Sequence, residues 1–174
     1  MVAVIRVLIF VVGSLLLSGC LGMPKAVEPV EQFELNNYLG KWYEIARLDH
    51  SFERGLSQVT ADYSLRSDGG VRVINRGFSA ENNEWKEAEG KSYFVDSNSE
   101  GYLKVSFFGP FYGSYVVFEL EENYQYAFIS GPSTDYLWLL SRTPTVEASV
   151  IEKFESMSKA RGFNTNDIIY VEHD

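Results

Sequence analysis

The sequence predicts an all-β fold: an eight-stranded antiparallel up-and-down β-barrel followed by one helix packed outside it. Eight short segments after Gly40 have strand patterns, and turn residues separate them. One later segment has a helical period instead of the period of two that the strands have. With 174 residues, the chain suits one domain with a core of its own. The pattern alone fits a β-sandwich equally well, so the motifs must separate the two folds.

The start of the chain has the features of a secretory signal. Arg6 is the only charged residue before Lys25. The apolar run at 7–17 is too short for a membrane-spanning helix, which needs about 20 apolar residues. We predict a signal peptide over 1–19, a linker over 20–32 and the barrel domain over 33–174.

The segment Leu17-Ser18-Gly19-Cys20 resembles the lipobox of bacterial lipoproteins. The resemblance implies cleavage before Cys20, diacylglycerol on its sulfur and acylation of its amine. One acyl chain anchors only marginally, so a multiply acylated cysteine would anchor firmly. Leu21 resembles lipoproteins sorted to the outer membrane, which would place the domain on the periplasmic side. The alternative is an ordinary or uncleaved signal with a chance cysteine.

Charge and histidine content exclude several function classes. The formal net charge is −9, and an acidic domain is repelled by nucleic acid and by anionic headgroups, so the acyl chains must supply membrane attachment. His50 and His173 share no metal-ligand or nucleophile–base spacing. We therefore predict no metal, no cofactor and no enzyme. Both histidines are expected to be solvated, with His50 in the first loop at the barrel mouth.

The strands follow in order along the chain. A helical turn at 35–39 precedes the first strand at 41–48. The second, 58–66, alternates with Val59, Ala61 and Tyr63 on one face, as a half-buried strand does. Asp68-Gly69 then predicts a hairpin turn. The remaining strands are predicted at 71–76, 84–94, 102–108, 114–121, 124–130 and 136–142, with an aromatic loop at 107–113.

A helical period begins after the eighth strand. Pro144 suits the first turn of a helix, and Gly162 suits its C-terminal stop. The apolar stripe of this helix consists of Val146, Val150, Ile151, Phe154 and Met157. A last short strand is predicted at 168–171.

Three motifs lie in the order expected of one family. The pair Gly40 and Trp42 resembles the Gly-x-Trp signature of lipocalins, Thr134–Tyr136 resembles the second lipocalin motif, and Arg142 resembles the third. The resemblance covers about 33–171. With the lipobox and the segments 43–47 and 107–113, it narrows to bacterial outer-membrane lipocalins, relatives of apolipoprotein D. It implies the barrel rather than the sandwich.

These motif residues are predicted to make the fold rather than to bind ligand. Trp42 would plug one end of the barrel, and the Arg142 guanidinium would lie across its indole. Gly40 would leave room for the closing turn.

Strand parity predicts which side chains point into the lumen. Parity with Trp42 places Glu44 and Ala46 inward. Further inward side chains follow from parity with Arg142, from the apolar strand faces and from the family resemblance. They are Val59, Ala61, Tyr63, Val71, Val73, Leu103, Val105, Phe107, Tyr115, Val117, Tyr136, Trp138 and Leu140. Ligand contact is predicted for Tyr63, Asn75, Val105, Phe107, Tyr115 and Trp138. A buried Glu44 must be paired or protonated, and we expect it to bond to backbone or to a buried arginine of the barrel floor. The alternative is that Glu44 meets the headgroup of the ligand.

The resemblance implies a lipid carrier that serves envelope maintenance. A fatty acid or a lysophospholipid would place its tail in the lumen and its headgroup at the mouth. The alternatives are a scaffold lipoprotein whose barrel is filled by side chains, and a haem binder with His50 as axial ligand. Isomerase lipocalins use a barrel cysteine, and Cys20 is the only cysteine here. The sequence leaves open whether the protein forms a homodimer. It also leaves open whether the loop 108–112 contacts a bilayer or a partner chain.

Overall fold

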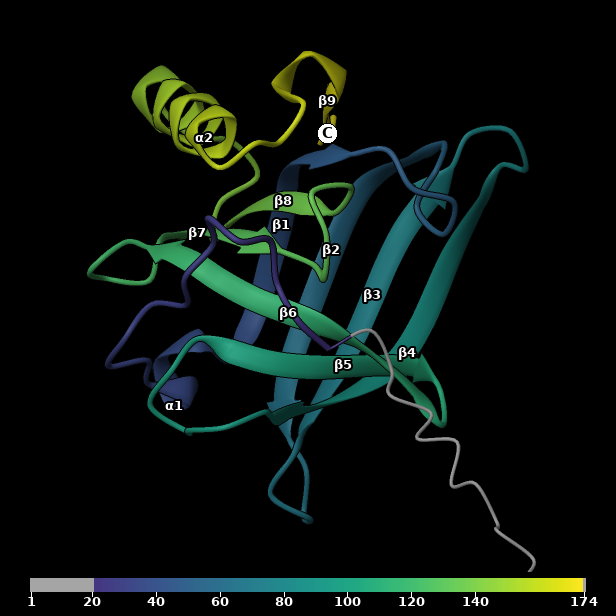
Figure 1. Ribbon diagram of the computed structural model, residues 1–174. Helices are drawn as coiled ribbons and strands as arrows, with labels where there is room; N and C mark the ends of the chain where they lie inside the picture. Colours follow the sequence, from purple (N-terminus) through teal and green to yellow (C-terminus); the bar gives the residue numbers. More distant parts are fainter. Residues whose placement is uncertain (1–20, 174) are drawn as a thin grey trace, which may run out of the picture.

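Eight antiparallel strands close into a barrel (Figure 1). The computed structural model describes residues 21–173, so Cys20 and the predicted signal peptide lie outside the described part. Closure follows because β1 (Gly40–Leu48) pairs with both β2 (Leu56–Leu65) and β8 (Leu137–Ser141). Between them lie β3 (Val71–Ser79), β4 (Glu84–Phe94), β5 (Tyr102–Phe108), β6 (Phe111–Leu120) and β7 (Tyr126–Ser130). The predicted up-and-down barrel is confirmed, and the sandwich is excluded.

The hairpin that joins β5 to β6 is tighter than predicted. The pairing of the two strands continues to Phe108 and Phe111 across a register shift, so only Gly109 and Pro110 lie between the strands. The aromatic residues at 107–113 therefore belong mainly to strands, not to a loop.

Helix α2 (Ala148–Ala160) packs on the outside of the barrel (Figure 1). Its Phe154 is buried, with its ring centroid 5.1 Å from that of Phe128 in β7. The helix begins later than predicted, and the first-turn role given to Pro144 is wrong. Thr143 donates its hydroxyl to the carbonyl of Thr145 at 2.7 Å, and such local side-chain bonds favour turns over helix.

The end of α2 agrees with the prediction. Gly162 has a φ of +87°, which is the left-handed conformation that favours glycine. Its N–H donates to the Lys159 carbonyl, and the N–H of Phe163 donates to the Ser158 carbonyl. This is a Schellman motif. A 3₁₀ turn (Thr165–Asp167) then leads into β9 (Ile168–Tyr170), which pairs with β1.

A bulge in β1 reverses the parity predicted for its second half. The register shifts between Glu44 and Ala46, because one extra residue lies there. Ala46 consequently pairs opposite Leu139 and joins the apolar cluster outside the barrel, while Arg47 pairs opposite Trp138 and reaches the carboxylate of Glu44. The predicted inward position of Ala46 is therefore wrong, and Arg47 takes its place.

The segment before the barrel is packed on it. Val27 is only 3% exposed, and the N–H of Val30 donates to the Val117 carbonyl at 2.9 Å. Gly101 permits this approach, since a Cβ there would lie 2.8 Å from Val30 and 2.9 Å from Val117. The part of the predicted linker that the structure describes is thus held against the barrel rather than extended away from it.

The closed end of the barrel is built as the motifs predicted. The Arg142 guanidinium lies 3.9 Å from the ring centroid of Trp42, which is fully buried. The Trp42 indole N–H donates to the Tyr38 carbonyl at 2.7 Å, in helix α1 (Leu35–Tyr38). Arg142 also donates to the carbonyls of Lys41 and Asn37, at 3.0 and 2.8 Å. The Arg142 guanidinium therefore hydrogen-bonds to both α1 and β1 while it stacks on the Trp42 indole.

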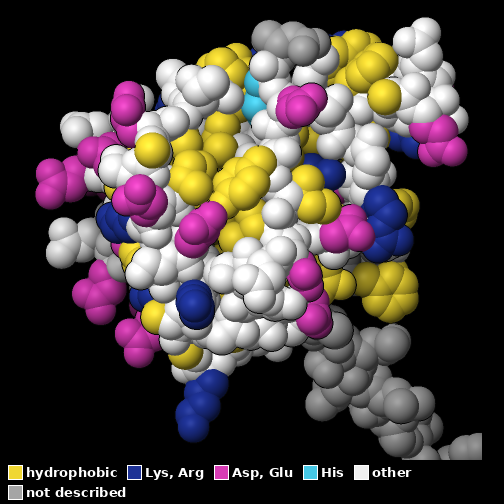
Figure 2. Space-filling model, turned by 90° about the horizontal axis from the view of Figure 1, so that it is seen from above, with side chains coloured by type: hydrophobic (Ala, Val, Ile, Leu, Met, Phe, Trp, Pro, Cys, Tyr) yellow, Lys and Arg dark blue, Asp and Glu magenta, His cyan; other side chains and the backbone are white. Residues whose placement is uncertain are grey.

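The face seen in Figure 2 carries scattered acidic side chains around hydrophobic side chains gathered near its centre. Within residues 21–173, no helix is long and apolar enough to cross a membrane.

We predict that Trp42→Ala lowers the free energy of unfolding by about 3–5 kcal/mol, because a large buried aromatic side chain is removed and a cavity is left. Urea unfolding followed by circular dichroism measures the change. Trp85→Ala is the matched control, since Trp85 is 46% exposed and its loss should cost much less. Equal stability of the Trp42 variant and the parent would contradict the plug role.

Candidate functional site

The barrel encloses a cavity of about 960 Å³. This volume lies near the upper end of the roughly 300–1,000 Å³ range of small-molecule sites. The wall is mainly apolar and aromatic, with a few polar groups, which is the usual character of such sites. The cavity weighs against a barrel filled by its own side chains.

The six side chains predicted to contact ligand all line this cavity: Tyr63, Asn75, Val105, Phe107, Tyr115 and Trp138. Most of the other predicted inward residues also line it, namely Glu44, Val59, Ala61, Val71, Val73, Leu103, Tyr136 and Leu140. Val117 is buried in an apolar cluster inside the barrel, together with Trp42, Leu103 and Leu140. The amide oxygen of Asn75 is buried without a partner among the described residues. Contact of these side chains with a ligand stays a prediction.

Exposed aromatic side chains surround the cavity mouth. Phe108 is 80% exposed and Phe111 is 62% exposed, and both line the cavity. Phe52, in the loop between β1 and β2, is also exposed and lines it. The open end thus lies at the loops after β1 and β5, opposite the Trp42 plug.

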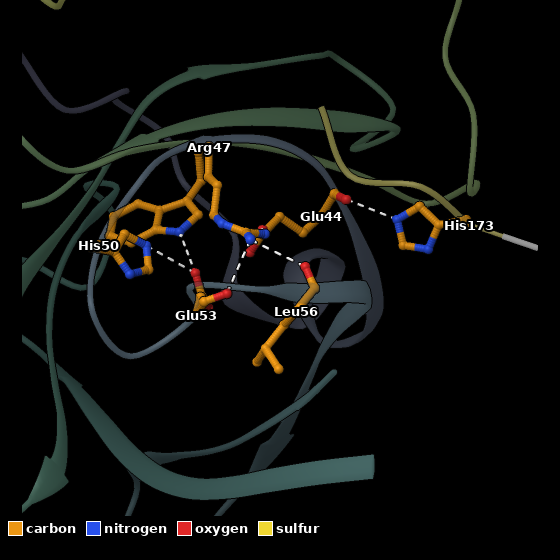
Figure 3. Close-up of polar contacts among 7 residues, drawn as sticks. Glu44, Arg47, His50, Glu53, Leu56 and His173 are labelled. Carbon is orange, nitrogen blue, oxygen red and sulfur yellow. Dashed lines mark hydrogen bonds and ion pairs between the residues drawn. The ribbon is translucent and has the colours of Figure 1, made fainter. Parts of the chain in front are cut away.

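A buried polar cluster lies between the cavity and the first loop (Figure 3). Arg47, only 2% exposed, donates to the Glu44 carboxylate at 2.6 Å. The same guanidinium donates to the carbonyls of Glu53 and Leu56, at 3.0 and 3.1 Å. The expected pairing of Glu44 with a buried arginine is confirmed. The pair lies beneath the loop 49–55, however, and not at the closed floor of the barrel.

The Glu53 carboxylate joins this cluster to the lumen wall. It accepts from the Trp138 indole at 3.1 Å and lies 2.9 Å from Nε2 of His50. His50 is buried and stacks on Phe52, so its expected solvation is wrong. This contact places a carboxylate at Nε2, one of the two nitrogens through which the imidazole could bind a haem iron. The spacing of three residues between His50 and Glu53 is the sequence feature that could have indicated this contact.

His173 is partly exposed and has contacts of its own. Its Nε2 lies 2.8 Å from the Glu44 carbonyl (Figure 3). Its ring packs edge-on against Tyr43. The end of the chain is thereby fixed to β1. Within residues 21–173, no group of three His, Cys, Asp or Glu side chains could hold a metal ion.

The pKa values of the two carboxyl groups in the cluster, Glu44 and Glu53, are shifted in opposite directions. Burial, with the nearby Glu53 charge, raises the pKa of Glu44 well above its usual value, although Arg47 opposes the shift. Burial would raise the pKa of Glu53 too, but hydrogen bonds from His50 and Trp138 and the charges of His50 and Arg47 hold it below the usual value. Glu53 is therefore the anion of the cluster, and Glu44 is the carboxyl that gains most from protonation.

Three phenols meet at the inner end of the cavity. The Tyr115 hydroxyl lies 2.6 Å from that of Tyr38 and 2.9 Å from that of Tyr63. Tyr38 packs against Trp42, with ring centroids 4.6 Å apart, and Tyr63 pairs opposite Gly40. The strand pattern predicted the inward positions of Tyr63 and Tyr115, but Tyr38 comes from the helical turn before the barrel and was missed.

We predict that Arg47→Leu destabilises the protein by about 3–5 kcal/mol at neutral pH, because Glu44 is left buried without its cation. The raised pKa of Glu44 would rise further, so the folded state would take up a proton before the unfolded chain does. The deficit should therefore narrow as the pH falls from 7 toward the ordinary carboxyl value of 4.5.

Urea unfolding at pH 7 and pH 5 measures this change. Arg72→Leu is the control, because Arg72 forms an exposed ion pair with Glu89 whose loss should cost little at either pH. A deficit in the Arg47 variant that is the same at both pH values would contradict the role given to Glu44.

Known proteins share both the sequence and the fold. A family model of a lipocalin-like domain matches residues 33–173. The outer membrane lipoprotein Blc of Vibrio cholerae is 70% identical over 168 residues, which are 96% of this chain and 98% of the relative. The Blc lipoprotein of Escherichia coli K12 is 49% identical over 86% of this chain and 84% of its own. Apolipoprotein D of Bos taurus is 36% identical over 66% of this chain and 63% of its own.

Solved structures agree in fold at lower identity. Insecticyanin from the tobacco hornworm Manduca sexta has a TM-score of 0.69 at 21% identity, covering 88% of this chain and 87% of its own. Lipocalins are a family of binding and transport proteins. With the closed barrel, the three motifs and these relatives in agreement, the chain belongs to the lipocalin family, in the group of the outer membrane lipoprotein Blc.

Proposed function

We propose that this lipocalin is a membrane-anchored carrier that stores or transports single-chain lipids, fatty acids or lysophospholipids, for maintenance of the cell envelope. The observation that carries the proposal is the cavity of about 960 Å³, apolar along its wall and closed at one end by Trp42. An acyl chain can lie along such a wall, while a charged headgroup stays in water at the mouth.

The ligand-contact residues follow from this orientation. Val105 and Phe107 in β5 would pack against the chain, and Trp138 would lie along it near the mouth. Asn75 would supply a polar contact, and Tyr63 and Tyr115 would lie against the inner end of the chain. Each of the six lines the cavity, and the unpartnered amide oxygen of Asn75 leaves an acceptor available.

Attachment through an acylated Cys20 would bring the mouth near the bilayer. The N–H of Gly22 donates to the Ser114 hydroxyl at 2.9 Å, so the described chain begins beside β6, three residues from Phe111 at the rim. Two of the relatives named above, the Blc proteins of Vibrio cholerae and Escherichia coli, are outer membrane lipoproteins. We infer the same location for this chain, with the barrel on the periplasmic side. Lipid would then enter or leave through the rim next to the anchor.

We predict saturable binding of lysophosphatidylcholine and of oleate to the domain 21–174, at micromolar concentration or below. This domain contains the complete barrel and both apolar clusters, so it should fold without the signal peptide. Tryptophan fluorescence measures binding, because Trp138 lines the cavity.

Trp138→Phe is the control: it should remove most of the fluorescence change while binding persists by calorimetry. A folded domain that shows no saturable change and no heat with either lipid would overturn the carrier role and favour a scaffold.

We predict that Cys20→Ser in the full chain moves the protein from the membrane fraction to the soluble periplasmic fraction, because the acceptor sulfur is lost. Fractionation followed by immunoblotting measures the distribution. Ser18→Ala is the matched control and should leave the protein with the membranes. A Cys20→Ser protein that has lost residues 1–19, as its mass shows, and still stays with the membrane after a salt wash would contradict lipid anchoring.

A further inference from the structure

The three phenols at the inner end of the cavity leave one hydrogen-bond donor unused. Tyr38, Tyr63 and Tyr115 each have one hydroxyl proton, and the only contacts among them are the two made by Tyr115. Two contacts use two protons, whichever hydroxyl donates in each. One O–H therefore remains, and no acceptor for it is found within residues 21–173.

The cluster that holds this spare donor forms part of the cavity wall. All three tyrosines line the cavity, and they come from α1, β2 and β6, so the hydroxyls converge from three sides. Burial raises the pKa of Tyr38, Tyr63 and Tyr115, so the phenols stay protonated at neutral pH. A buried donor without an acceptor is costly, and a ligand that supplies the acceptor relieves that cost.

The surroundings favour an uncharged acceptor over an anion. Besides burial, the negative charge of Glu53 raises the pKa of Tyr63, and this anion would oppose a second negative charge beside it. Arg142 is the nearby cation, but its hydrogen bonds go to backbone carbonyls, including those of Lys41 and Asn37. A carboxylate buried there would thus lack a free cationic partner.

We infer that the inner end of the cavity is a subsite for an uncharged oxygen acceptor, a carbonyl or ester group, at the buried tip of an otherwise apolar ligand. The inference rests on the proposed function and narrows it: oxygenated chains are preferred over plain chains of the same length. The donor comes from the tyrosine cluster, defined as Tyr38, Tyr63 and Tyr115.

The test compares three lysophosphatidylcholines of equal chain length: one with a plain chain, one with a ketone near the far end and one with a carboxylate there. We expect the domain 21–174 to bind the ketone form about fivefold more tightly than the plain form, as one net hydrogen bond gives. The carboxylate form should bind less tightly than either.

Phenylalanine variants separate the donor from the packing. The triple variant Tyr38→Phe, Tyr63→Phe and Tyr115→Phe should lose the ketone preference and still bind the plain lipid. The double variant Tyr38→Phe with Tyr63→Phe should keep the preference, because Tyr115 then holds a lone donor. Tyr126→Phe, which changes a tyrosine packed on the outer face of the barrel, is the matched control and should change nothing.

A measurement on the unmutated domain gives an independent answer. The infrared carbonyl stretch of the bound ketone should be lowered to the range seen in hydrogen-bonding solvents. A stretch typical of apolar solvents, equal binding of ketone and plain chains, or tightest binding of the carboxylate form would each overturn the inference while leaving the carrier role standing. Failure of every lipid to bind would instead refute the proposed function, and the subsite with it.

Discussion

The contact between Arg142 and Trp42 is the interaction on which the rest of the structure depends. A barrel that keeps its lumen open cannot fill its interior with side chains, so rigidity must come from its closed end and from its outer face. Arg142 supplies the first, because one guanidinium stacks on the indole and bonds to backbone of both α1 and β1. Helix α2 supplies the second through Phe154. The closed end and the helix on the outer face therefore stabilise the barrel without filling its cavity.

The opposite end is held by polar contacts rather than by apolar ones. Arg47 fixes the first loop to the barrel without closing the mouth, since it donates to the Glu53 carbonyl of that loop as well as to the Glu44 carboxylate in β1 and the Leu56 carbonyl in β2. Trp138 belongs to both systems, with its indole N–H on Glu53 and its ring in the cavity wall. A ligand that moves Trp138 would therefore be felt by the loop at the mouth.

The sequence could predict the fold because local pattern and long-range motif agree. Val59, Ala61 and Tyr63 alternate without interruption, so parity places them correctly. Parity fails in β1, where the bulge after Glu44 turns Ala46 outward and Arg47 inward. A bulge depends on how the neighbouring strand and β9 pair, and one strand's own residues do not specify it. The burial of His50 and the joining of Tyr38 to the tyrosine cluster likewise arise from contacts between distant segments.

Native mass spectrometry of the domain 21–174 with lysophosphatidylcholine tests the central claim, that the lumen holds one single-chain lipid, most directly. Val105→Trp would place an indole inside the lumen, across the path of an acyl chain, whereas Lys104→Trp places the same side chain at a position that does not line the cavity. The account predicts one bound lipid per chain for the parent and for the Lys104 variant, and none for the Val105 variant. Equal lipid on both variants, or none on the parent, would contradict it.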